Sequence, residues 1–302
     1  GAPSDPSAPV TPTAAVPGAP TAVIATRNGN QSLNVSFTAP SANGAAITGY
    51  TVTSRSGGIT ATGTASPITV TGLENGTAYS FRVTATNGIG TGHASKASNK
   101  IRPSTVPGKP TNVKVVRGNG QATVSFAAPV DVGGVPGNGG SPITSYAVSL
   151  NEVISFTKAA SPITVTGLEN GSEYTFKVWA NNENGKGAEA KSNPVTPATL
   201  PGAPVINGTE DGNTQVTVLF TAPTIDGGNP ITKYTVTSSP GGKTATAASS
   251  PITVTGLTNG TAYTFTVKAT NDVGTGFASA PSGKAIPGHL AGPSAMIPAA
   301  RR

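Results

Sequence analysis

The sequence predicts an all-β fold made of three tandem seven-stranded β-sandwiches. Three observations support this fold class: one set of segments occurs three times, apolar residues alternate with polar ones inside each copy, and turn-forming residues are abundant. The 302 residues include 39 Gly and 27 Pro, without a collagen-like period. Such turn formers, mixed with Val, Ile and Thr, favour short strands over long helices.

The internal repeat is the strongest signal. Its best-preserved string is SPITVTGLENGTAY at 66–79, which returns with few changes at 161–174 and 250–263. Self-similarity at a fixed period indicates repeated structural units. We therefore predict, in chain order, a Pro-rich extended tail, three modules and a C-terminal tail, at residues 1–16, 17–105, 106–199, 200–287 and 288–302.

The strands of the first module follow from its apolar alternation. Apolar residues occupy every second position in three runs: Leu33, Val35 and Phe37; Tyr50 and Val52; and Tyr79, Phe81, Val83 and Ala85. A period of two indicates a strand with one buried face and one solvated face. The dipeptide Asn28-Gly29 marks a hairpin turn between the first two strands. About seven such strands in about ninety residues are typical of a β-sandwich.

These segments resemble the fibronectin type III domain, an immunoglobulin-like β-sandwich, over about residues 17–287. The resemblance rests on the opening PGAP-x-x-V, the strands x-Val-x-Phe-x-x-Pro and Ile-Thr-x-Tyr-x-Val, and the run Gly-Leu-x-Asn-Gly-x-x-Tyr-x-Phe-x-Val. Where the family often has Trp, this chain has Phe37, Phe126 and Phe220. The resemblance implies a tyrosine corner in each copy, in which a hydroxyl bonds to nearby backbone, at Tyr79, Tyr174 and Tyr263.

The inventory of reactive groups is poor. The chain has two His residues, His93 and His289, and no Cys. It lacks a nucleophile elbow, a zinc-protease motif and a phosphate loop. Glu210, Asp211 and Asn213 offer oxygen atoms, but a hairpin turn explains them more simply than a calcium site does. We predict no catalytic, cofactor-binding or metal site, and therefore a protein that is not an enzyme.

Charge and composition limit the partners. The net charge is +7, but the basic residues are scattered over all three copies. Nucleic-acid binders usually gather them on one face, so we expect no nucleic-acid partner and at most a weak attraction to anionic glycans or a bacterial surface. No apolar run is long enough to span a membrane. The absence of Cys favours a bacterial or phage source.

Candidate contact residues lie where the copies differ. Trp179 aligns with Thr84 and Lys268 and is in phase with the outward face, so we expect an exposed protein or glycan contact. The alternative is packing against a neighbouring strand or an adjacent module. The loop at 129–144 is six or seven residues longer than its counterparts. It offers a second contact at Val132, Val135 and Asn138, with plain flexibility as the alternative.

Together these features predict an extracellular or cell-surface structural and adhesive protein. Prolines on both sides of each module link, at 101–110 and 195–204, predict a semi-rigid rod. Assembly with copies of itself into an appendage or filament would use sheet edges or the tails, with Met296 and Ile297 as candidate contacts. Alternative functions are a spacer or binding module of a secreted polysaccharide-degrading enzyme or phage tail fibre, and a receptor-like ligand-binding module.

Overall fold

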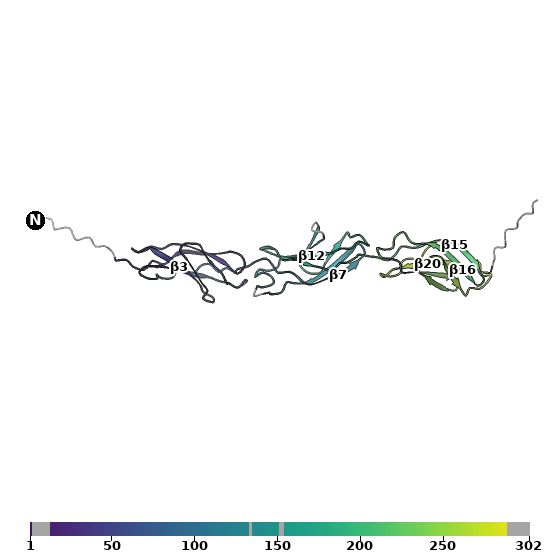
Figure 1. The fold of residues 1–302 in the computed structure, drawn as a ribbon, viewed down its shortest axis with the longest axis horizontal. Coiled ribbons are helices and arrows are strands. Elements are labelled where there is room, and N and C mark those ends of the chain that lie inside the picture. The colour runs from purple at the N-terminus through teal and green to yellow at the C-terminus, as the bar shows by residue number, and fades with distance from the viewer. Residues whose placement is uncertain (2–12, 133–134, 151–153, 289–302) are drawn as a thin grey trace, which may run out of the picture. The chain divides into compact units, whose positions relative to one another are not determined.

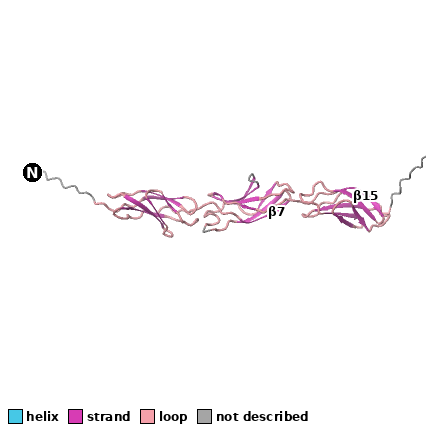
Figure 2. Ribbon diagram, in the orientation of Figure 1, coloured by secondary structure: helices cyan, strands magenta, loops and turns pink. Residues whose placement is uncertain are grey.

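The described part of the chain is built from strands and loops. A computed structural model describes residues 1, 13–132, 135–150 and 154–288, and contains no helix in these ranges (Figures 1 and 2). The chain divides into two compact units. The first comprises Gly1–Lys114, Ser125–Ile163 and Lys177–Ser192, and the second comprises Val115–Val124, Thr164–Phe176 and Asn193–Arg302. The predicted all-β sandwich fold is confirmed.

The first module contains two antiparallel three-stranded sheets. Their strand orders are β1-β2-β5 and β4-β3-β6. The strands are β1 (Thr21–Arg27), β2 (Leu33–Thr38), β3 (Ile47–Ser54), β4 (Thr60–Gly63), β5 (Ile68–Val70) and β6 (Phe81–Asn87). The alternation predicted for β2 and β6 is observed, because their apolar residues are buried in one shared core. Within it, the Phe37 and Tyr50 rings lie 4.7 Å apart, a favourable separation for aromatic rings.

The position of the seventh strand is occupied by an irregular segment beside β6. Ser95 N donates to Val83 O, and Val83 N donates in return to Ser95 Oγ, both at 2.9 Å. Ser98 makes the same pair of bonds with Phe81. Serine hydroxyls thus satisfy backbone donors that a regular strand would bond with carbonyl groups. The third module repeats this device with Ser279 and Ser282.

The second module has a larger sheet of order β10-β9-β12-β13, with β14 also paired to β12, and a smaller sheet of order β11-β8-β7. Its strands are β7 (Thr111–Gly118), β8 (Gln121–Ala127), β9 (Ser145–Leu150), β10 (Ile154–Lys158), β11 (Ile163–Thr166), β12 (Phe176–Asn182), β13 (Gly185–Lys186) and β14 (Ala190–Lys191). The Phe126 and Tyr146 rings lie 5.0 Å apart, which reproduces the aromatic pair of the first module.

The third module repeats the first. Its sheet orders are β15-β16-β19 and β18-β17-β20. The strands are β15 (Val205–Gly212), β16 (Gln215–Thr221), β17 (Lys233–Ser239), β18 (Thr244–Ala247), β19 (Ile252–Thr255) and β20 (Thr264–Thr270). Val216, Val218, Val236, Phe265 and Val267 are fully enclosed in its core.

The implied tyrosine corners are present in all three modules. The Tyr79 hydroxyl accepts a hydrogen bond from Glu74 N at 3.0 Å, and Tyr174 accepts one from Glu169 N at the same distance. In the third module Tyr263 accepts from Thr258 N at 3.1 Å. This bond lowers the pKa of the Tyr263 phenol, because an N–H donor stabilises the phenolate.

Candidate functional site

The loop end of each module is organised around one buried asparagine. At the end of β12, Asn182 Nδ2 donates to Thr105 O at 2.8 Å and to Asn138 O at 2.9 Å. Its Oδ1 accepts from Asn184 N at 2.9 Å. Asn182 is 5% exposed, so its amide bonds to the segment that enters the module and to the long loop without competition from solvent. We call this arrangement the linker clamp.

The other two modules carry the same clamp. Asn87 Nδ2 donates to Ala15 O at 2.8 Å, and Asn271 Nδ2 donates to Thr199 O at 2.8 Å. Both also bond to the carbonyl group of a loop residue. Sequence reasoning missed these three asparagines, although the signal was available: Asn is the second residue of TNGIGTG, NNENGKG and TNDVGTG.

The clamps of Asn182 and Asn271 each lie beside an ion pair. Within the first compact unit, Arg27 Nη2 lies 2.9 Å from the Glu183 carboxylate, which also accepts a hydrogen bond from Ser141 Oγ. The hydrogen bond from Arg27 is the main cause that lowers the pKa of Glu183. Within the second unit, Arg117 Nη2 lies 3.1 Å from Asp272. All four side chains are 39–55% exposed, so each pair contributes at most about 1 kcal/mol.

The long loop of the second module is closed in its described part. Val132 and Val135 exchange two backbone hydrogen bonds of 3.0 Å, and Asp131 Oδ1 accepts from Gly137 N at 2.8 Å. These bonds oppose the flexibility that its glycine content suggested. Val132 is 72% exposed, whereas Val135 is half-buried. Asn138 is exposed and caps Gly140 N. The loop therefore presents Val132 to solvent, and a contact role for these residues stays a prediction.

The exposure expected for Trp179 is wrong, because this side chain is only 9% exposed. Its residue is in the outward phase of β12, but the ammonium group of Lys186 lies 4.1 Å from the ring centroid and covers it. Such cation–π packing desolvates the ring. Glu189 holds Lys186 in place at 2.6 Å. The packing alternative therefore describes Trp179 better than the exposed contact, and its role in binding stays a prediction.

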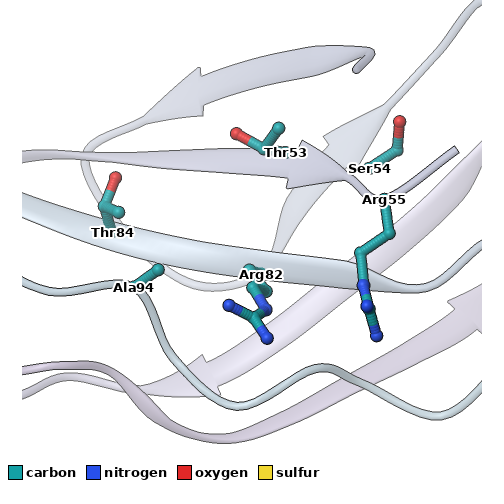
Figure 3. A pocket seen from close by; sticks show the side chains of 6 residues that line it. All are labelled: Thr53, Ser54, Arg55, Arg82, Thr84 and Ala94. Carbon is teal, nitrogen blue, oxygen red and sulfur yellow. The ribbon is translucent and has the colours of Figure 1, made fainter. Parts of the chain in front are cut away.

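A groove on the first module was not expected from the sequence. Thr53, Ser54, Arg55, Arg82, Thr84 and Ala94 line this open groove, whose volume is about 420 Å³ (Figure 3). Arg82 on β6 is paired in register with Thr53 on β3. In Figure 3 the Arg55 and Arg82 side chains extend in the same direction from their backbones. Both residues are exposed, and neither has an ion-pair partner among the described residues.

Some predicted features fall outside the described residues, namely residues 2–12 of the N-terminal tail and Met296 and Ile297 of the C-terminal tail. Over the described ranges, no three His, Asp or Glu side chains gather into a group that could hold a metal ion. In the same ranges, no helix is long and apolar enough to cross a membrane.

Comparison with known proteins places the repeats in one domain family. The sequence model of the fibronectin type III domain matches residues 18–101, 108–198 and 203–284. The chain is 31% identical over 240 residues to M-protein, striated muscle, of Gallus gallus, and 30% identical over 287 residues to Exoglucanase B of Cellulomonas fimi. The matches cover 70% and 89% of this chain but only 16% and 25% of those relatives.

A solved structure of tandem domains is also similar. The crystal structure of chicken CNTN1 FN1-FN3 domains is 18% identical in sequence, with a TM-score of 0.32. The match covers 90% of this chain and 99% of that chain.

Proposed function

Because the chain belongs to the fibronectin type III domain family, as three tandem repeats, we propose that it is a structural and adhesive protein of the extracellular space or cell surface. In this proposal the chain is not an enzyme, and its modules form a semi-rigid rod that holds adhesive surfaces away from their anchor. Fibronectin type III domains are commonly extracellular, which supports the location.

The linker clamp is the observation that carries this proposal. A spacer needs links that resist bending, and a module link resists bending when its backbone is bonded to the module that follows. Asn182 supplies such bonds to Thr105, which follows Pro103 and precedes Pro107. Proline fixes φ on either side of the bonded residue and removes further freedom. The ion pair between Arg27 and Glu183 adds an orienting contact of low energy.

Solution scattering tests the stiffness directly. We expect the pair-distance distribution of the purified chain to be that of one extended, narrow ensemble. The double variant Asn182→Ala/Asn184→Ala removes the side-chain bonds to Thr105 and should broaden this distribution. Asn207→Ala is the matched control, since its amide donates to Thr221 Oγ1 within the third module. A wild-type chain as broadly distributed as the double variant would overturn the semi-rigid rod.

A second candidate function is a spacer in a secreted polysaccharide-degrading enzyme. The similarity to Exoglucanase B favours it, because the match covers 89% of this chain. Both candidates assign catalysis to no residue of this chain. An assay with the purified chain on cellulose should therefore detect no released sugar. Hydrolysis that persists after repurification would contradict both.

Assembly with further copies is part of the same proposal. The first strand of each module lies at a sheet edge, and these strands expose the aliphatic side chains of Ile24, Val116 and Val205. Exposed apolar edges are templates for strand pairing between chains. Sedimentation velocity over a hundredfold range of concentration should show growing species, and a single unchanged monomer would remove the filament version.

A further inference from the structure

Positive charge is concentrated in the first module. Residues 17–105 contain six Lys or Arg side chains and one acidic side chain, Glu74. By contrast, residues 106–199 contain seven basic and six acidic side chains, and residues 200–287 contain four of each. The difference in charge comes mainly from the acidic residues, because the first module has one and the second has six. The first module therefore supplies most of the net charge of +7.

The groove of Figure 3 lies on this basic module. Comparison with the second module shows that the groove lacks an acidic side chain. Arg82 and Lys177 are at equivalent positions, because each follows its corner tyrosine by the same number of residues. Ala94 and Glu189 are equivalent in the same way, counted from the clamp asparagines. In the second module Glu189 lies 3.3 Å from Lys177 and forms an ion pair with it. In the first module a methyl group replaces that carboxylate, so the guanidinium of Arg82 lines the groove without a counter-charge.

The groove residues suit an oxyanion. Arg55 and Arg82 each present a planar guanidinium group, which binds carboxylate or sulfate with two parallel hydrogen bonds. Thr53 adds a hydroxyl group to the same lining, and Thr84, which also lines it, donates its own hydroxyl to Thr51 O at 3.5 Å. None of these side chains has to break an ion pair with an acidic group before it binds an oxyanion. The free-energy cost of freeing these side chains for the ligand is therefore low.

The surface favours a polymer over a single small ion. A second groove, of about 600 Å³, shares Ala94 with the first and includes Lys96 and the segment from Ala19 to Val23 in its lining. Repeated anionic groups along a chain could contact Arg55 and Arg82 in one groove and Lys96 in the next. The two linings share Ala94 and together hold three basic side chains, those of Arg55, Arg82 and Lys96, and such positive charge attracts a polyanion from solvent.

We propose that this face of the first module binds an anionic polysaccharide, through carboxylate or sulfate groups held by Arg55 and Arg82. The site deepens the adhesive role proposed above, but it does not depend on stiff module links. A chain with flexible links would still bind, so failure of one proposal leaves the other testable.

Affinity measurements with the full chain test this site. The probes are alginate for carboxylate, dextran sulfate for sulfate, and neutral dextran as the uncharged control. We expect binding to at least one charged polymer, no binding to neutral dextran, and a loss of affinity as NaCl screens the charges. Arg55→Ser/Arg82→Ser should weaken binding about tenfold or more, because two charge-assisted contacts are lost. Ala94→Glu, which supplies the counter-charge found in the second module, should weaken it in the same direction.

The matched control removes equal charge elsewhere. Lys243→Ser/Lys284→Ser lowers the net charge by the same amount on exposed positions of the third module, and should leave affinity within about threefold. Circular dichroism checks that each variant is folded. Equal losses in the two double variants would show a nonspecific charge effect and overturn the site. Absence of binding to both polymers, or tighter binding to duplex DNA than to either, would also overturn it.

Discussion

Asn182 Nδ2 lies 2.8 Å from the carbonyl oxygen of Thr105, and this contact ties a module to the segment that enters it. The two residues are 77 positions apart in the sequence. The bond thus connects the end of β12 to the segment that precedes the module, and the equivalent bonds of Asn87 and Asn271 repeat it. A role in positioning the entering segment explains why this buried residue is polar in all three modules.

The first prediction concerns the stability of the second module. Asn182→Ala removes the hydrogen bonds of a buried amide to the carbonyl groups of Thr105 and Asn138, so we expect a loss of about 1–3 kcal/mol in the free energy of unfolding. Urea denaturation followed by tryptophan fluorescence measures it, because Trp179 is the only Trp of the chain and reports the second module. The matched control Asn271→Ala breaks the clamp of the third module and should leave this transition in place; an unchanged Asn182→Ala variant would refute the prediction.

The second prediction concerns the tyrosine corner. Tyr174→Phe removes the hydroxyl that accepts from Glu169 N, so the urea transition of Trp179 should move to a lower concentration, with a cost of about 1 kcal/mol. Tyr263→Phe makes the same change in the third module and should not move the Trp179 transition. If both variants shifted it equally, the corner would not act locally.

The third prediction separates steric overlap from backbone conformation. Gly139 and Gly167 have φ values of +72° and +75°, so an alanine at either position costs about 1–2 kcal/mol. A Cβ atom at Gly139 would also overlap the Thr105 carbonyl oxygen, whereas one at Gly167 would meet nothing within 4 Å. Gly139→Ala should therefore destabilise the second module more than Gly167→Ala does, by the same urea measurement. Equal costs would show that the loop and entering segment move apart freely.

The fourth prediction concerns acid. The pKa of Glu189 is lowered, mainly by its hydrogen bond with Lys186, and the pKa of Glu183 is lowered mainly by its hydrogen bond with Arg27. A carboxyl whose pKa is lower in the folded state stabilises it above the unfolded-state pKa, and this contribution is lost as pH falls through the folded-state pKa. The urea midpoint of the second module should fall from neutral to acidic pH. Glu189→Gln should reduce the size of that fall, and a wild-type midpoint independent of pH would contradict the assignment.

The fold could be predicted from sequence because its signals are local and repeated three times. Alternation in β2 and β6 predicted the strands, and the resemblance of the repeated motifs to one domain family predicted the sandwich type and its corner tyrosines. The burial of Trp179 could not be predicted, because its ring packs against Lys186, a residue of β13 that is in register with Asn181 and is not adjacent to Trp179 in sequence. Phase along a strand says which face a side chain is on, but not what covers that face.

The candidate sites were harder to predict for a similar reason. Sequence reasoning treated departures between copies as the places for function, and this led to Trp179 and the long loop. The groove of Arg55 and Arg82 keeps its positive charge because no carboxylate is present there. Ala94 occupies the position that Glu189 has in the second module. An alanine attracts no notice until the structure shows which cation its counterpart neutralises.

The most direct test of the central claim, that linker clamps couple neighbouring modules, is the rotational correlation time of each module from backbone ¹⁵N relaxation of the full chain. We predict that the first and second modules share one correlation time in the wild-type chain and separate into two in Asn182→Ala/Asn184→Ala. Two independent, shorter correlation times in the wild-type chain would contradict the claim.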